Sequence, residues 1–252
     1  MLLRDTLFII LAALVAVVML FLSTRTVPES WRDREHSVLD GFDSFNRMLF
    51  AFTLSFAIVM GWQALDSAHQ ACASESDALS SVYWSADSLP EPARTEVQSM
   101  VRNYFVSVVE QEWPLMVRGQ ASSHSESTLD DLRKMLYTVR TSAEPAPLRT
   151  DALDQVQTVA QARAQRLALA TSQVPRFIEV ELIVSGFLIL ALPIMREKDF
   201  TARTVAPAAV LAAFTVAVIA SVFELNHPFG GAIRVGPDMF LAELANLNGA
   251  QA

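Results

Sequence analysis

Residues 48–65 read MLFAFTLSFAIVMGWQAL, a stretch without one charged side chain. Three further stretches are similar: Leu7–Leu22 has no polar side chain, Thr204–Phe223 has no charge, and Leu182–Met195 is uncharged and extends back to Phe177 if two glutamates are tolerated. A helix rises about 1.5 Å per residue and the hydrocarbon core of a bilayer is about 30 Å thick, so about 20 apolar residues span it. Unpaired backbone amides are costly in lipid, so continuous apolar runs are expected to be helices. The sequence therefore predicts an all-α membrane protein with four transmembrane helices.

The four stretches are paired two and two around a long polar insert. Residues 1–65 are expected to hold transmembrane helices 1 and 2, and residues 177–225 to hold helices 3 and 4. Residues 66–176 contain more than half of the 46 acidic and basic residues, which predicts an insert that folds in water. Residues 226–252 are expected to form a turn motif followed by a short amphipathic helix that begins at Pro237-Asp238.

The insert has helical patterns and no strand signature. Asp66–Trp84 contains neither glycine nor proline, so the second span is expected to continue out of the membrane as one helix. From Val97 to Glu112 apolar residues recur at spacings of three and four, which predicts a helix with a single buried face. Pro114 and Gly119 are expected to end or bend that helix.

Two more helices are expected before the third span. A capping-box-like pattern predicts that one begins at Ser127 and runs to Val139. The run at residues 144–147 contains two prolines and is expected to be a turn or loop, followed by a helix over 150–172. Together these patterns predict a small antiparallel helical bundle.

Composition excludes several classes of function. The net charge of −8 and the lack of clustered Lys and Arg argue against a nucleic-acid partner. Cys72 is the single cysteine, so an intrachain disulfide is impossible. The four histidines lack the spacing of metal ligands, and no nucleophile motif or phosphate-binding loop occurs. We therefore expect no metal, no cofactor and no enzymatic activity.

Charges in the short connections predict the orientation in the membrane. Residues 23–47 and 196–203 would lie on one side and carry seven Lys and Arg residues, whereas the other side has few basic residues near its membrane ends. The positive-inside rule counts Lys and Arg in short loops and largely ignores long domains. The short connections are therefore expected in the cytoplasm, and the insert and both termini outside it.

Two motifs resemble a known family. After the fourth span the chain reads ELNHPFGGAIRV from Glu224 to Val235, and the insert contains Glu112-Trp113-Pro114 after Tyr104. These segments resemble a bacterial membrane family of unknown function that is described as bestrophin-like, whose C-terminal motif commonly reads Glu-Leu-Asp-Arg-Pro-Phe-Ser-Gly. Residues 163–167 also resemble the arginine-rich helix that precedes the family's third span. The matching motif residues are Glu224, Leu225, Pro228, Phe229, Gly231, Arg234, Glu112, Trp113 and Pro114.

The resemblance covers nearly the whole chain, and it implies a fold and a function. Bestrophins are oligomeric chloride-conducting channels with four spans per subunit and a large segment between the second and third spans. The resemblance therefore implies a homo-oligomeric channel in a bacterial inner membrane, with the lipid bilayer and small inorganic ions as partners. Bestrophins keep the large segment in the cytoplasm, whereas the charges here place it outside. The sequence also allows a second reading, a non-conducting membrane sensor or scaffold whose insert docks a partner.

Five titratable residues are expected near one membrane surface: Glu179, Glu181, Glu224, Asp66 and His69. One interpretation is that they cap helices in the headgroup zone. The other is that they line a pore or vestibule, or bind a proton or cation, because acidic residues close to hydrocarbon are costly and often functional. Acidic rings favour cations, so the acids point to a cation and the resemblance to an anion.

The C-terminal motif is expected to fold the chain back. Pro228 and the glycines at 230 and 231 favour a tight turn, with an anion-binding backbone nest as the alternative. Phe229 and Ile233 are apolar residues in a segment too short for its own core, so both are expected to pack against the outer ends of the spans or the first helix of the insert.

Overall fold

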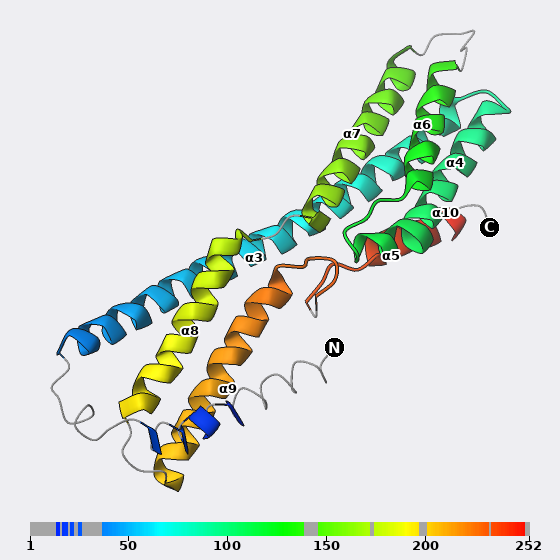
Figure 1. The fold of residues 1–252 in the computed structure, drawn as a ribbon. Helices are drawn as coiled ribbons and strands as arrows, with labels where there is room; N and C mark the ends of the chain where they lie inside the picture. The colour runs from blue at the N-terminus through cyan, green and yellow to red at the C-terminus, as the bar shows by residue number, and fades with distance from the viewer. Residues whose placement is uncertain are drawn as a thin grey trace. The chain divides into compact units, whose positions relative to one another are not determined.

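The computed structural model describes residues 14–15, 17–19, 21–22, 25–26, 37–138, 146–171, 174–196, 201–231 and 233–249. Most of the first predicted span, residues 7–22, lies outside the described residues. Throughout the described part of the chain, every regular element is a helix, which confirms the all-α prediction (Figure 1). The elements in chain order are α3 (Ser37–Ser85), η1 (Ala86–Ser88), α4 (Ala93–Ser107), the π-helical turn η2 (Val108–Glu112), α5 (Trp113–Met116), α6 (Ser123–Thr138), α7 (Ala146–Thr171), α8 (Arg176–Arg196), α9 (Ala202–Leu225) and α10 (Asp238–Gly249).

The chain divides into two compact units. The membrane unit comprises residues 1–62 and 173–226, and the helical bundle comprises residues 63–172 and 227–252. Helix α3 contributes its first half to the membrane unit and its second half to the bundle. The absence of Gly and Pro after the second apolar stretch predicted this continuation, and α3 confirms it.

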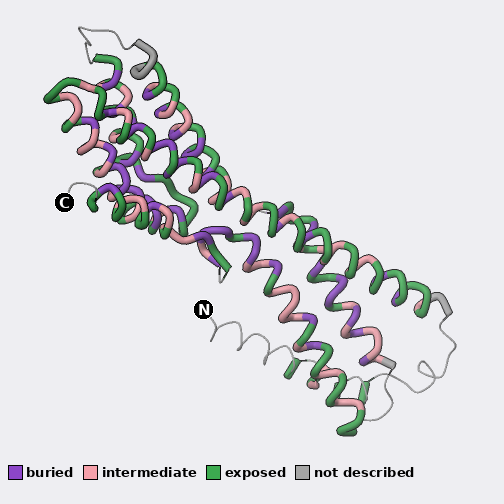
Figure 2. The backbone as a smooth tube through the Cα atoms, turned by 180° about the vertical axis from the view of Figure 1, so that it is seen from behind, coloured by how far each residue is buried: buried purple, intermediate pink, exposed green. Residues whose placement is uncertain are grey.

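Three helices are long and apolar enough to cross a membrane among the described residues, within Leu39–Ser88, Thr150–Met195 and Ala202–Leu225. They contain the second, third and fourth apolar stretches of the sequence. Few residues are buried along the first half of α3, whereas buried residues are frequent along its second half (Figure 2). This contrast is what lipid around one half and a protein core around the other would produce.

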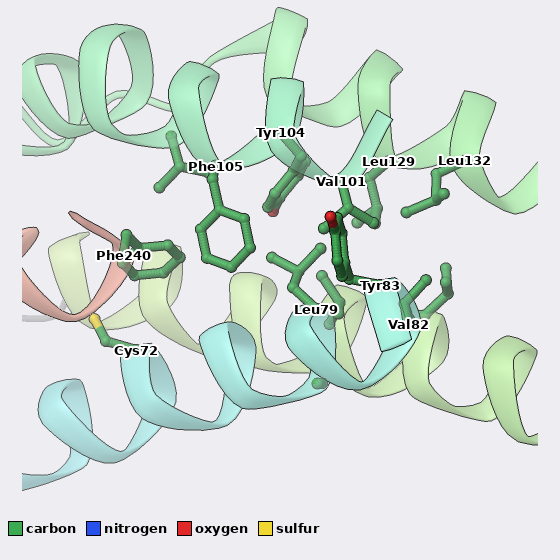
Figure 3. Close-up of a cluster of buried hydrophobic side chains, with 14 of the residues drawn as sticks. Cys72, Leu79, Val82, Tyr83, Val101, Tyr104, Phe105, Leu129, Leu132 and Phe240 are labelled. Atoms are coloured by element: carbon green, nitrogen blue, oxygen red, sulfur yellow. The ribbon is translucent and has the colours of Figure 1, made fainter. Parts of the chain in front are cut away.

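The bundle has a core of aliphatic and aromatic side chains. The second half of α3 presents Cys72, Leu79 and Val82 at spacings of seven and three residues, so they lie on one face of the helix. Tyr104 and Phe105 of α4 and Leu129 of α6 pack against this face, and Phe240 comes from α10 (Figure 3). The single apolar face predicted for α4 is therefore confirmed, since Val97, Val101, Tyr104 and Phe105 are buried.

A π-helical turn separates α4 from α5. Pro114 has no backbone N–H, so the carbonyl one turn earlier cannot receive its usual hydrogen bond. The Trp113 N–H instead bonds to the carbonyl of Val108, five residues back. The predicted bend at Pro114 therefore takes the form of this turn, and the helix ends before Gly119, whose φ is 70°.

Two helix starts differ from the prediction. Helix α6 begins at Ser123 rather than Ser127, because the Ser122 hydroxyl caps it by accepting the Ser125 N–H at 3.4 Å. Helix α7 begins at Ala146 rather than Thr150, with Pro147 in its first turn, where the missing N–H costs nothing.

The C-terminal segment belongs to the bundle. Phe229 is 2% exposed, which confirms the expectation that it packs, whereas Ile233 is 54% exposed, so the prediction for that residue is wrong. The buried apolar residue of this segment is instead Val235, which is 7% exposed. Helix α10 begins at Asp238, as predicted, and buries Phe240 and Leu247.

In the membrane unit, α3, α8 and α9 pack closely where small residues face the neighbouring helices. Ala57 of α3 joins Ile178 and Leu182 of α8 and Val222 of α9 in one cluster. Close approach needs Gly61, because a β-carbon there would lie 2.8 Å from Cβ of Leu225. Small residues at helix contacts are typical of membrane helices, where tight packing replaces the hydrophobic driving force.

Candidate functional site

The bundle buries four charged side chains together. Arg163 and Arg166 project from α7, Glu112 ends the π-helical turn, and Glu75 lies in α3. The side chains of Arg166, Glu75 and Glu112 have no exposed surface, and that of Arg163 is 9% exposed. Two positive and two negative groups make the cluster neutral, which is the condition under which charges tolerate burial.

Arg166 is the centre of this ion cluster. Its guanidinium donates to both carboxylate oxygens of Glu75, from Nε to Oε2 at 2.7 Å and from Nη2 to Oε1 at 2.9 Å. Nη2 also donates to Oε1 of Glu112 at 2.7 Å, and Nη1 contacts the Met116 sulfur. The guanidinium lies 5.6 Å from the ring centroids of Trp113 and of a second aromatic residue on α10.

Further donors complete the cluster. Arg163 donates from Nη2 to Oε2 of Glu112 at 2.8 Å and to the Ser122 carbonyl at 3.0 Å. The Tyr104 hydroxyl donates to Oε1 of Glu75 at 2.8 Å. Each carboxylate thus receives several charge-assisted hydrogen bonds, and the cluster joins α3, α4, the π-helical turn and α7.

Burial and charge pairing act against each other on these groups. Burial disfavours the ionised form of Glu112, but hydrogen bonding by Arg163 and attraction to Arg166 outweigh it and lower the pKa of Glu112. Burial also opposes the charge of Arg166, yet the attraction of Glu75 raises its pKa. Burial first and the Glu75 charge second raise the pKa of Tyr104. Glu112 is therefore held in its ionised form, and both carboxylates are saturated with hydrogen-bond donors, which suits a structural role rather than acid–base chemistry.

The four acids and one histidine expected at a membrane surface are divided between the two units. Glu179, Glu181 and Glu224 belong to the membrane unit, and Asp66 and His69 belong to the bundle. Asp66 and His69 are exposed on α3, and Asp66 accepts a hydrogen bond from a glutamine one turn later. Glu224 is half-buried near the end of α9.

Glu179 is bound to the end of α9. The Asn226 side chain donates to Oε1 of Glu179 at 3.0 Å and accepts the Val174 N–H at 2.7 Å. Asn226 occupies the position where the family commonly has aspartate. Its amide supplies a donor that an aspartate lacks, so the end of α9 is held to the beginning of α8 without two adjacent carboxylates.

Glu181 is the acid with an unsatisfied atom. Its Oε1 accepts the Ser185 hydroxyl at 2.5 Å, whereas its Oε2 is buried and has no hydrogen-bond partner among the described residues. The Ser185 carbonyl in turn accepts the side-chain amide of Asn46, which reaches across from α3 at 3.1 Å. One turn along α3, Asp43 pairs with Arg47 at 2.9 Å.

The sequence reasoning singled out Glu112 and the arginine-rich segment but missed Glu75 and the pairing. A signal was present in the periodicity. Arg163 and Arg166 continue the buried stripe of α7 that contains Val156 and Val159, at spacings of three and four. Glu75 lies in the same way on the stripe of α3 with Cys72 and Leu79. Charges on an apolar stripe must find partners, so three such residues indicate a buried cluster.

Comparison with known proteins agrees with this architecture. The model of the bestrophin-like domain matches residues 10–240. The chain belongs to the bestrophin-like family. No curated protein matches the sequence.

Solved structures show the same fold at low sequence identity. A variant of a bacterial bestrophin homologue from Klebsiella pneumoniae matches with a TM-score of 0.76 and 16% identity, covering 97% of this chain and 99% of that one. A second crystal structure of the Klebsiella pneumoniae homologue gives 0.74 and 16%, with 96% and 97% covered. A further structure, described as a membrane protein, gives 0.76 and 15%, with 96% and 97% covered. The fold is therefore that of bacterial bestrophin homologues, and the chain is a membrane protein.

Proposed function

We propose that this chain is one subunit of a homo-oligomeric, bestrophin-like ion channel in a bacterial inner membrane. The observation that carries the proposal is the fold, which follows bestrophin homologues over nearly the full length of both chains. Bestrophins, which this family resembles, are oligomeric channels rather than enzymes. The channel-like role follows from family and fold together.

The surface of the membrane unit supports assembly in lipid. Large apolar side chains are exposed along all three described spans, including Phe52 of α3, Phe177 of α8 and Phe214 of α9, each more than 70% exposed. Such surface is stable only against lipid or another subunit. Asn46 of α3 donates a hydrogen bond to the Ser185 carbonyl of α8, so these two polar groups are used between helices and do not line a channel within one subunit. An ion path is therefore expected between copies.

Two features point to different ions. The likeness to chloride-conducting bestrophins supports an anion, whereas Glu179, Glu181 and Glu224 would favour a cation. The unsatisfied Oε2 of Glu181 is where an ion, a water molecule or a neighbouring subunit would complete the hydrogen bonding.

Ion flux into liposomes tests the proposal. Purified protein is reconstituted, and flux of chloride and of potassium is measured separately under matched gradients. We expect flux of one of them, altered in Glu181→Gln and Glu224→Gln and unchanged in Glu110→Gln, an exposed residue of the bundle. If neither ion passes, the channel is rejected. If flux is equal in all variants, the role of the two acids is rejected.

The alternative function is a non-conducting sensor or scaffold. More than half of the chain belongs to the bundle, which is more than a linker between spans requires. Its surface has a groove of about 290 Å³ between α4 and α6, lined by Asn103, Gln111, His124 and Asp131 among others. A protein that reconstitutes as an oligomer but passes no ions would favour this alternative.

Orientation remains the prediction made from charge, with the bundle outside the cytoplasm. Cysteines introduced at Ser123 and at Ser30 should be labelled in intact cells from outside at Ser123 alone. Native Cys72 does not interfere, because burial raises its pKa to about 12 and the thiolate is the reactive form. Labelling at Ser30 and not at Ser123 would place the bundle in the cytoplasm, as in bestrophins.

A further inference from the structure

Both motifs that carry the family resemblance border one cavity in the bundle. The Trp113 ring packs edge-on against Phe229, with ring centroids 5.7 Å apart and an interplanar angle of 85°. Around this pair lies a cavity of about 260 Å³, which is also lined by Val117, Arg234 and Asp238. The cavity is slightly smaller than the lower end of the range for drug-sized ligands, about 300 Å³, so it suits a small metabolite.

The cavity carries one positive and one negative side chain that do not satisfy each other. Arg234 and Asp238 are both exposed, and neither forms an ion pair or side-chain hydrogen bond with any described residue. Glu112, the acid of the Glu-Trp-Pro motif, is instead committed to the ion cluster, where it pairs with Arg163 and Arg166. The two groups at the cavity are therefore available to a ligand.

Backbone structure holds the negative group in place. Asp238 is the first residue of α10, and its carboxylate lies over Gly236, where a β-carbon would come within 2.5 Å of Oδ2. Glycine at 236 thus leaves room for this carboxylate at the cavity. The chain is also anchored directly after Arg234, because the Val235 N–H bonds to the Pro228 carbonyl at 2.8 Å and Phe240 is fully buried.

We propose that this cavity binds a small zwitterion of the amino-acid class. Arg234 would bind the ligand's carboxylate, and Asp238 its ammonium group. A simple anion would face repulsion from Asp238, and a simple cation would face repulsion from Arg234. A ligand with both charges satisfies both side chains at once, and its carbon chain would lie against Val117 and Trp113. The site lies outside the membrane unit and is independent of whether the protein conducts ions.

Ligand-dependent stabilisation of the purified full-length protein tests the proposal. The probes are straight-chain amino acids from glycine to aminohexanoate, each compared with the carboxylate and the amine of the same chain length. A ligand that binds only the folded protein raises its melting temperature in a saturable way. We expect one chain length to do so at millimolar concentration, and its singly charged counterparts not to.

Variants show whether the two charges form the site. Arg234→Gln and Asp238→Asn should each weaken the binding by about tenfold or more, because each removes a charge-assisted contact. Arg176→Gln and Asp77→Asn, which change exposed charges elsewhere, should bind as the wild type does. Melting without ligand checks that each variant folds. The proposal is wrong if no amino acid stabilises the protein, if a singly charged counterpart binds equally well, or if either site variant keeps full affinity.

Discussion

The helical bundle buries a cluster of four charged side chains, three of them completely, whereas the membrane unit buries mainly uncharged polar side chains. In the bundle each carboxylate of the ion cluster accepts several hydrogen bonds, and Arg166 donates to both Glu75 and Glu112. In the membrane unit Asn46 bonds to a backbone carbonyl, and Glu181 has a single hydroxyl donor. Full burial of charge thus occurs where a folded core supplies every partner.

Many large apolar side chains are buried in the bundle, and many are exposed in the membrane unit. Phe105 and Phe240 are fully buried in the bundle, whereas Phe52 and Phe214 of the membrane unit are each 71% exposed. One continuous helix, α3, carries both patterns. The first half of α3 thus exposes its apolar side chains and the second half packs them into a folded core, a difference that can be tested one unit at a time.

Removing the central cation of the bundle should have the largest effect. Arg166→Met leaves the carboxylates of Glu75 and Glu112 buried without their main partner, and breaking a buried ion pair costs about 3–5 kcal/mol. We expect a large fall in the free energy of unfolding, measured by denaturant unfolding in detergent. Arg118→Met, at an exposed position, should change it by less than about 0.5 kcal/mol. Similar stability of both variants would mean that the cluster is dispensable.

Truncating Phe229 should have a comparable effect. Phe229→Ala removes a buried ring that packs on Trp113, and such a change costs about 3–5 kcal/mol when the site cannot collapse. Ile233→Ala, four residues later and exposed, is the matched control. Melting temperatures in detergent compare the two. Equal melting would show that the C-terminal segment does not contribute to the core of the bundle.

In the membrane unit the corresponding test concerns close helix packing. Gly61→Ala places a β-carbon 2.8 Å from Cβ of Leu225, an atom near the backbone that cannot easily move, so we expect a loss of about 1–3 kcal/mol. Gly41→Ala meets nothing within 4 Å and should be neutral or slightly stabilising. The comparison uses melting temperature in detergent. A loss in Gly41→Ala as large as in Gly61→Ala would contradict the packing.

The smallest expected effect is a dependence of bundle stability on alkaline pH. Burial raises the pKa of Cys72 to about 12, whereas an unfolded cysteine has a pKa of about 8.5. The neutral thiol therefore contributes stability that is fully present below about pH 8.5 and is lost as the pH rises toward 12, by up to about 1.4 kcal/mol per pH unit. Unfolding between about pH 8 and pH 10 should be less pH-dependent in Cys72→Ala. An unchanged slope would assign the effect to other groups.

Periodicity and helix-breaking residues were enough to predict most of the helices. Val97–Glu112 gave α4 and its buried face, and Pro237-Asp238 gave the start of α10. The errors arose where a local choice depends on capping. Ser127 and Ser122 are both suitable caps, and only the folded chain shows that Ser122 is the one used.

The ion cluster was harder to predict because its partners are far apart in sequence. Glu75 lies 91 residues from Arg166, and a charged residue on an apolar stripe does not identify its partner. The π-helical turn adds to the difficulty, since it shifts the helix register just before Glu112. The prediction for Ile233 failed for a related reason: apolar character alone does not show which residues of a short segment face the core.

The most direct test of the account is a cryo-electron microscopy reconstruction of the purified protein in lipid nanodiscs. The account predicts a closed ring of identical subunits, with the exposed apolar faces of α3, α8 and α9 against lipid or neighbouring subunits. A continuous polar path should run between the copies and not through one subunit. A monomer, or a ring whose axis is closed by apolar side chains in every class of particle, would contradict the proposal that this protein is a channel.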